Sequence, residues 1–321
     1  MLAALVLALA ADLVPFNDLG PAPYAWGYYG GLYEDGSNTI PADHLAAGMR
    51  RSALIRPLDA NGNPSPNGKV VFLGVGFGET ARITDAFIGM AANDHRVDHQ
   101  SLVVLNAAHE GFDAPAWYAP LATVNFNRIK DQILTPNGVS EQQVQAAWVQ
   151  MTTTEQAPPL PKQDSQAYRV KGYIATALRN LKARYPNLQV AYLSSRVYGG
   201  YAGAEPYAYE SALSVRWVIM GQVTLMRTGF LWDTRISDVD YEKGVAPWVA
   251  WGPYLWADGT MPRSDGLTWE RDDFDADGAS LSEKGAHKGA TMLLDFLLQE
   301  PTATHWFRAP NAPARTRAVR P

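Results

Sequence analysis

The 321-residue sequence contains no cysteine, which excludes disulfide bonds, thiolate metal ligands and a cysteine nucleophile. Positive charge is not in excess either, because 27 Lys and Arg residues stand against 32 Asp and Glu residues and give a net charge of −5. We therefore expect no nucleic-acid partner. Beyond the first residues, no apolar run approaches the roughly 20 residues of a membrane span, so none is expected. The composition, with 47% hydrophobic residues, is typical of a globular protein. The length of the chain suits one α/β domain with long loops.

The first eleven residues are apolar and end in an Ala-x-Ala pattern. This pattern predicts a secretory signal, residues 1–11, that is cleaved after Ala10 or Ala11. The positively charged start of such a signal is absent, and the alternative is an N-terminal helix packed on the core. On the signal-peptide interpretation the protein is secreted or periplasmic.

Residues 12–68 are rich in Pro, Gly, Asn and aromatic residues and show little periodicity. They predict an irregular N-terminal extension that lies over the domain and ends in a turn-rich loop. The spacing of Asp59, Asn61 and Asn63 is that of a calcium loop, but Pro64 and Val70 replace the Gly and Glu that such a loop needs. We expect a turn there, and a disordered tail over residues 308–321.

Regular alternation of strands and helices begins at residue 69. Short apolar runs predict buried parallel strands over residues 69–75, 102–106, 144–149 and 188–193. Helical periodicity covers residues 165–185, 208–226 and 282–298. This order predicts one α/β domain, residues 69–307, with a parallel sheet and helices on both faces. Ligands of such sheets bind at the carboxyl ends of the strands, which is where functional residues are expected.

The first of these strand ends is rich in glycine. Its glycines stand at positions 74, 76 and 78, whereas a dinucleotide fingerprint separates the second and third by three positions. No matching acid follows the next strand. We expect no nucleotide cofactor, and no cofactor of any other kind.

Blocks at the strand ends resemble those of the SGNH/GDSL hydrolases. Gly74-Val-Gly-Phe-Gly-Glu-Thr80 is similar to a Gly-x-Gly-Phe-Ser-Asn-Thr block, and Asp273-Phe-Asp-Ala-Asp-Gly-Ala-Ser280 to an Asp-Phe-x-x-Asp-Gly-Thr-His block, of a bacterial group of SGNH-like proteins. Residues 192–196, 205–211 and 247–258 also match long stretches of that group. The resemblance covers residues 69–307 and implies the SGNH fold, a three-layer α/β/α sandwich with a flavodoxin-like parallel sheet.

The resemblance also implies site positions, and two of them have changed. The nucleophile position falls on Gly78 and the general-base position on Ser280, whereas the orienting acid is kept as Asp277. Gly111 matches the oxyanion glycine, and the oxyanion Asn has no clear equivalent, Gln150 being the nearest candidate. Loss of the nucleophile or the base lowers turnover by about 10⁶. The chain is therefore interpreted as a pseudoenzyme.

Two alternatives stay open at this point. His109 follows the second strand and could act as a relocated base in an active ester hydrolase, with Thr80, Ser194 or Ser195 as the hydroxyl. Asp273, Asp275 and Asp277 could instead open a calcium loop, although Lys284 stands at its closing position. No metal site is predicted.

The remaining question is what the crevice binds. Residues 248–269 combine aromatic and acidic side chains, which suits sugars but equally suits rings that fill gaps between loops and helices. We expect a small-molecule or glycan ligand, and the sequence predicts no particular protein partner; an export-associated structural protein with no small ligand is a weaker option. The predicted ligand-binding residues are Glu79, Thr80, Glu110, Arg196, Tyr198, Trp256 and Asp258.

Overall fold

The computed structural model describes residues 13–25, 27–118 and 121–310. The predicted signal lies outside them, as does most of the predicted disordered tail. The strands are β1 (Pro23–Ala25), β2 (Tyr28–Tyr29), β3 (Val70–Gly76), β4 (Leu102–Asn106), β5 (Val144–Gln150), β6 (Val190–Ser194) and β7 (Trp248–Trp251). The α-helices are α1 (Phe16–Leu19), α2 (Ala42–Ser52), α3 (Gly78–Asn93), α4 (Leu121–Arg128), α5 (Gln166–Arg184), α6 (Tyr207–Thr228), α7 (Glu283–Gln299) and α8 (Thr304–Phe307).

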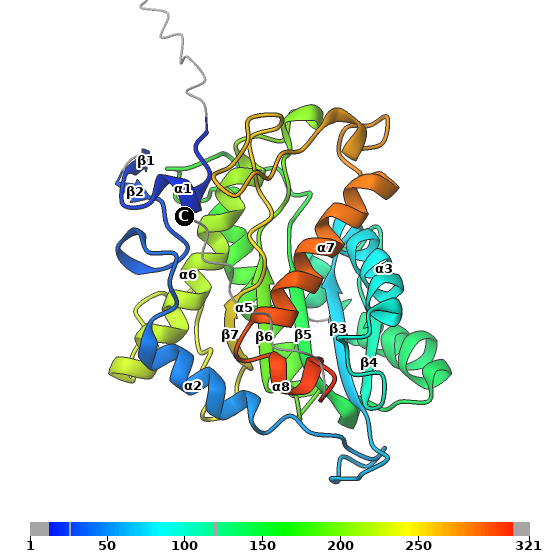
Figure 1. Ribbon diagram of the computed structural model, residues 1–321. Coiled ribbons are helices and arrows are strands. Elements are labelled where there is room, and N and C mark those ends of the chain that lie inside the picture. The colour runs from blue at the N-terminus through cyan, green and yellow to red at the C-terminus, as the bar shows by residue number, and fades with distance from the viewer. Residues whose placement is uncertain (1–12, 26, 119–120, 311–321) are drawn as a thin grey trace, which may run out of the picture.

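The central sheet has five strands in the order β4-β3-β5-β6-β7, and every neighbouring pair is parallel. This confirms the predicted α/β class and the four predicted strands. The fifth strand, β7, was missed, because it lies at the start of the segment interpreted as an aromatic-acidic loop. Figure 1 shows the sheet at the centre of the molecule with helices in front of it and behind it.

Alternate side chains of the strands pack into two separate hydrophobic cores, one on each face of the sheet. In β3, Val71, Leu73 and Val75 belong to the core shared with α5 and α6, whereas Val70 and Phe72 belong to the core shared with α3, α7 and α8. Alternation of this kind follows from the two-residue period of a strand, and burial on both faces explains why β3 is apolar throughout. The result is a three-layer α/β/α arrangement.

The N-terminal extension is more regular than predicted. It contains α2, which packs against β7, and the antiparallel pair β1–β2. The approach of α2 to the sheet is close, because a Cβ atom on Gly48 would lie 2.3 Å from the Trp248 ring. The predicted turn at Asp59 is present, and its carboxylate accepts hydrogen bonds from the backbone of Asn61 and Asn63.

At the C-terminal end, Arg308 and Ala309 of the predicted tail contact residues 96–97. Arg308 forms a bridge with Val97, and the Ala309 backbone donates to the carbonyl of Arg96. Residues 311–321 of that tail lie outside the described residues. Within the described residues, no helix combines the length and apolar character that a membrane crossing needs.

Candidate functional site

A cavity of about 400 Å³ opens at the carboxyl edge of the sheet. Its walls come from the start of α3, from the loops that follow β4, β5 and β6, and from the loop that precedes α7. The lining residues are Phe77, Gly78, Glu79, Arg82, Glu110, Gly111, Thr152, Thr153, Thr154, Arg196, Ala279 and Ser280. Six positions chosen from the sequence thus line one cavity, namely Gly78, Glu79, Glu110, Gly111, Arg196 and Ser280.

Gly78 is the first residue of α3, and its missing side chain leaves room in the cavity. A Cβ atom built there would lie 3.2 Å from Cγ of Glu110. The Glu110 side chain is 64% exposed, so it can move by the few tenths of an ångström that a larger residue would need. The position predicted for the nucleophile therefore lines the cavity but carries no reactive group.

Ser280 occupies the position expected for the general base, and it is bonded to the retained acid. Its Oγ donates to Oδ2 of Asp277 over 2.7 Å, and the backbone N–H groups of Ala279 and Ser280 donate to Oδ1. These hydrogen bonds lower the pKa of the exposed Asp277 to about 2. The turn requires Gly278, which has φ +69° and lies against the Tyr201 carbonyl. Asp277 therefore holds a hydroxyl that cannot serve as a base at neutral pH.

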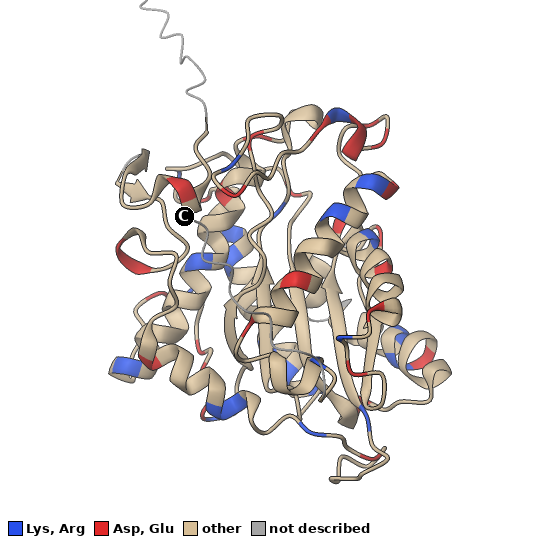
Figure 2. Cartoon of the chain, in the orientation of Figure 1, with Lys and Arg blue, Asp and Glu red and all other residues tan. Residues whose placement is uncertain are grey.

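Arg82 was not selected from the sequence, although it connects both sides of the cavity mouth. Its Nε donates to Oε1 of Glu110 over 3.2 Å, and its Nη1 donates to Oδ2 of Asp275 and to the Leu281 carbonyl, both over 2.5 Å. Figure 2 shows acidic and basic residues intermingled around the N-terminal end of α7. Arg82 thereby ties the loop after β4 to the loop before α7.

Glu79 lies on the floor of the cavity and is almost fully buried, with 3% of its side chain exposed. Its Oε1 accepts hydrogen bonds from Nε2 of Gln150 and from the Val197 backbone, whereas its Oε2 has no hydrogen-bond partner. The nearest charge is Arg196, whose Nε is 4.0 Å from Oε2. Burial raises the pKa of Glu79, and the positive charge of Arg196 opposes that effect.

Gln150, the nearest candidate for the oxyanion amide, is fully committed inside the protein. Its Nε2 donates to Glu79 and to the Ser195 carbonyl, and its Oε1 accepts from the Thr80 hydroxyl. The wall next to it consists instead of Thr152, Thr153 and Thr154, which sequence reasoning missed. Asp113 anchors this wall by accepting from the backbone and hydroxyl of Thr154, each over 2.8 Å.

Four of the predicted ligand-binding residues do not line this cavity. Thr80 is fully buried behind Gln150, and Trp256 is fully buried with its indole N–H donated to Glu205 over 2.8 Å. Tyr198 packs edge-on against the Trp256 ring, and its carboxylate neighbour Asp258 is half-buried. The rings of residues 248–269 therefore fill the protein interior, with the five Trp and Tyr side chains of this segment at most 5% exposed.

The candidate relocated base, His109, is exposed and does not line the cavity. Its Nδ1 contacts the Glu110 carbonyl, and its ring packs on Phe112. Among the described residues, one Ser or Thr hydroxyl is hydrogen-bonded to a histidine ring, that of Ser52 to Nδ1 of His305 (3.3 Å), and this bond joins α2 to α8 away from the cavity. The hydroxyl–imidazole pair that hydrolysis requires is thus not found in the crevice.

The three aspartates of the candidate calcium loop have separate partners. Asp273 pairs with Lys288 and Lys284, Asp275 pairs with Arg82, and Asp277 binds the turn at Ser280. Their carboxylates therefore do not converge. In the part of the chain that the structure describes, no group of three His, Cys, Asp or Glu side chains is placed to hold a metal ion.

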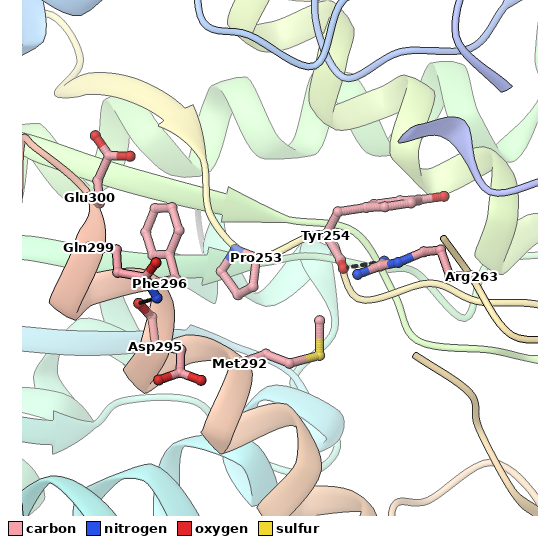
Figure 3. Close-up of a pocket in the computed structure, with 8 residues that line it drawn as sticks. All are labelled: Pro253, Tyr254, Arg263, Met292, Asp295, Phe296, Gln299 and Glu300. Atoms are coloured by element: carbon pink, nitrogen blue, oxygen red, sulfur yellow. Dashed lines mark hydrogen bonds between the residues drawn. The ribbon is translucent and has the colours of Figure 1, made fainter. Parts of the chain in front are cut away.

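A second cavity, of about 430 Å³, lies between α7 and residues 253–263 (Figure 3). Its charged groups are already committed: the guanidinium of Arg263 pairs with Asp265 and donates to the carbonyls of Tyr254 and Trp256. Glu300 accepts hydrogen bonds from the backbone and hydroxyl of Thr302. Arg263 and Glu300 thus have hydrogen-bond partners, whereas in the crevice at the sheet edge Oε2 of Glu79 and Nε of Arg196 have none.

Comparison with known proteins yields similar structures only. No family model and no curated protein matches the chain. One similar solved structure is a protein from Arabidopsis thaliana, with 11% sequence identity and a TM-score of 0.34 over 68% of this chain and 66% of that one. Another is a protein from Bacillus subtilis, with 14% identity and a TM-score of 0.34 over 73% of this chain and 57% of that one. A third is the periplasmic domain of a lipopolysaccharide acetyltransferase from Salmonella serovar Paratyphi A, with 12% identity and a TM-score of 0.33 over 79% of this chain and 94% of that one. The chain spans less than two thirds of the first two proteins, and similarity at this level assigns neither family nor activity.

Proposed function

We propose that this chain is an SGNH/GDSL-hydrolase-like protein that binds a glycan or an acylated ligand in the crevice at the sheet edge without hydrolysing it. The observation that carries the proposal is the composition of the crevice. Residues from α3 and from four loops line it, and its volume of about 400 Å³ suits a small ligand. Gly78 and Ser280 line it at the two positions where the resemblance expects a nucleophile and a base.

The chemical argument against hydrolysis is that the relay acts as a unit. A serine nucleophile needs an imidazole to take its proton, and the imidazole needs a carboxylate to orient it. Only the carboxylate, Asp277, is kept, and it binds the hydroxyl of Ser280. Loss of the nucleophile or the base costs about 10⁶ in turnover, so residual hydrolysis falls to the level that binding alone supports.

The active alternative, with His109 as the base, has little support because its ring lies on Phe112 and not in the cavity. Secretion or a periplasmic location is part of the proposal and rests on the apolar residues 1–11 alone. The domain limits 69–307 are likewise proposed from the resemblance, with the extension that precedes them packed on the same core.

The absence of catalysis is tested with short-chain aryl esters. We expect no measurable hydrolysis by the unmodified chain, and none by Gly78→Ser or Ser280→His alone, because each supplies half of the relay. The double variant should gain a slow activity, since Asp277 can orient the new imidazole while the missing oxyanion amide still costs about 10²–10³ in rate. Robust hydrolysis by the unmodified chain that survives Asp277→Ala would refute this assignment.

Binding in the crevice is tested by filling its mouth. Ala279 lines the cavity and is exposed, so Ala279→Trp should abolish binding of any ligand that occupies it. Ala276→Trp is the matched control, because Ala276 is exposed on the same loop and does not line the cavity. Loss of binding in both variants, or in neither, would place the ligand elsewhere on the protein.

A further inference from the structure

Two buried arginines among the described residues, Arg216 and Arg263, donate hydrogen bonds to groups inside the protein. Arg263 donates to Asp265 and to two carbonyls, and Arg216 donates to the carbonyls of Tyr29, Gly30 and Gly31. These two side chains therefore act as internal braces. Arg196 has only 17% of its side chain exposed, and its Nε, like the Nε of Arg51, has no hydrogen-bond partner among the described residues.

Arg196 and Glu79 line the same cavity and form an ion pair that contains no hydrogen bond. The Nε of Arg196 and the Oε2 of Glu79 both lack a hydrogen-bond partner, and they are 4.0 Å apart, beyond direct hydrogen-bond distance. The guanidinium carbon lies 5.9 Å from the ring centre of Phe77, which lines the same cavity. A buried charged group without a hydrogen bond is unfavourable, so a ligand group that forms hydrogen bonds with both side chains would gain affinity from them.

We propose that Glu79 and Arg196 form a subsite for a neutral, hydroxyl-bearing ligand, that is, a sugar without a charged substituent. This inference rests on the proposed function and names the class of ligand. Oε2 of Glu79 and Nε of Arg196 are themselves buried, so a ligand hydroxyl has to enter between the two side chains. There it can donate to Oε2 of Glu79 and accept from the guanidinium of Arg196, either through one oxygen or through two neighbouring hydroxyls. The ring of Phe77 provides an apolar surface beside Arg196, and Thr152 and Thr153 also line the cavity.

The charge of the cavity favours a neutral ligand over a charged one. Its ionisable lining residues are two acids, Glu79 and Glu110, and two arginines, Arg82 and Arg196, so their formal charges cancel. A ligand carboxylate that approached Arg196 would also lie against the carboxyl of Glu79, and a ligand ammonium at Glu79 would lie against Arg196. A hydroxyl avoids both repulsions, because it carries no net charge.

The experiment compares neutral sugars with an anionic and a cationic sugar. Ligand-observed NMR is applied to methyl glycosides of glucose, galactose and mannose, and to glucuronate and glucosamine as the anionic and cationic counterparts. For the unmodified chain we expect binding of at least one neutral glycoside and at least tenfold weaker binding of the charged sugars. Glu79→Gln and Arg196→Gln should each weaken the neutral glycoside about tenfold or more.

The two variants also predict opposite changes in selectivity, which a loss of structure could not produce. Glu79→Gln leaves Arg196 without its carboxylate, so glucuronate should gain affinity. Arg196→Gln leaves Glu79 without its counter-charge, so glucosamine should gain affinity. Far-UV circular dichroism confirms that both variants are folded.

Two results would overturn the subsite. One is the absence of binding of every neutral glycoside, and the other is preferential binding of glucuronate by the unmodified chain. Binding of another probe, such as an O-acetylated glycoside or a fatty acid, that Ala279→Trp abolishes and Glu79→Gln leaves unchanged would reject this subsite while sustaining the proposed function. Binding that persists in Ala279→Trp would instead reject the crevice itself.

Discussion

At the scale of single residues, the turn at Ser280 determines the acidity of Asp277. Backbone and side-chain hydrogen bonds from Ser280, and a backbone bond from Ala279, lower the pKa of Asp277 to about 2. Because the pKa is lower in the folded state than the ordinary value of about 3.9, the ionised carboxylate stabilises the fold above about pH 4. That contribution is lost as the pH falls from about 4 to about 2.

Removing the Ser280 hydroxyl should therefore shift this titration. In Ser280→Ala the two backbone N–H bonds to Oδ1 remain, so the pKa of Asp277 should rise above 2 without reaching the ordinary value. Carboxyl carbon NMR titration measures the change, and Asp277→Asn identifies the resonance. An unchanged pKa would mean that the backbone bonds alone determine the acidity.

At the scale of elements, the contact between α3 and α7 brings together the two helix starts that border the cavity. The helices approach closely at Gly289, where a Cβ atom would lie 2.7 Å from Cδ1 of Ile83. We expect Gly289→Ala to destabilise the protein by about 1–3 kcal/mol through overpacking. Gly89→Ala, on the exposed side of α3 with nothing within 4 Å of the new Cβ, should stabilise it by up to about 1 kcal/mol.

Urea unfolding of the two variants measures this difference. Both changes add one methyl group to a helix and raise its helix propensity equally. The difference between their free energies of unfolding therefore measures the cost of the closer contact between α3 and α7. Equal stabilisation of the two variants would show that α7 can move away from Ile83 without loss.

The elements also show which parts of the fold a sequence can reveal. The strands β3 to β6 were predicted because a strand buried on both faces is a continuous apolar run. The strand β7 was missed because it has four residues, two of them tryptophan, inside a segment of rings and prolines. The helix α3 was missed because it begins with glycine and contains Thr84 and Gly89, so packing against α7, and not propensity, stabilises it.

Some residues of the candidate site could likewise be predicted from the sequence, and others could not. Residues that directly follow strands could be placed at one edge, because the carboxyl ends of parallel strands meet there. The bridge from Arg82 to Asp275 could not, since it depends on how a long side chain crosses between segments 193 positions apart. Trp256 was chosen for its residue type, and its burial follows from packing that composition does not encode.

At the scale of the whole molecule, the N-terminal extension belongs to the same core as the sheet. Phe16 is 1% exposed, stacks on Tyr209 of α6 with ring centres 4.5 Å apart, and donates its backbone N–H to the Tyr254 hydroxyl. Arg216 of α6 further ties the extension down through the carbonyls of residues 29–31. Extension and sheet should therefore unfold as one cooperative unit.

The substitution Phe16→Ala tests whether the extension and the sheet unfold together. Removal of a buried phenylalanine side chain should cost about 3–5 kcal/mol, and because the core is shared, this loss should lower the urea midpoint of the entire protein. Tryptophan fluorescence and far-UV circular dichroism should report the same lowered midpoint. Val14→Ala, at a side chain that is 43% exposed, is the control and should change stability by no more than about 0.5 kcal/mol. A separate early transition, with the midpoint of the sheet unchanged, would show that the extension is only attached to an independent domain.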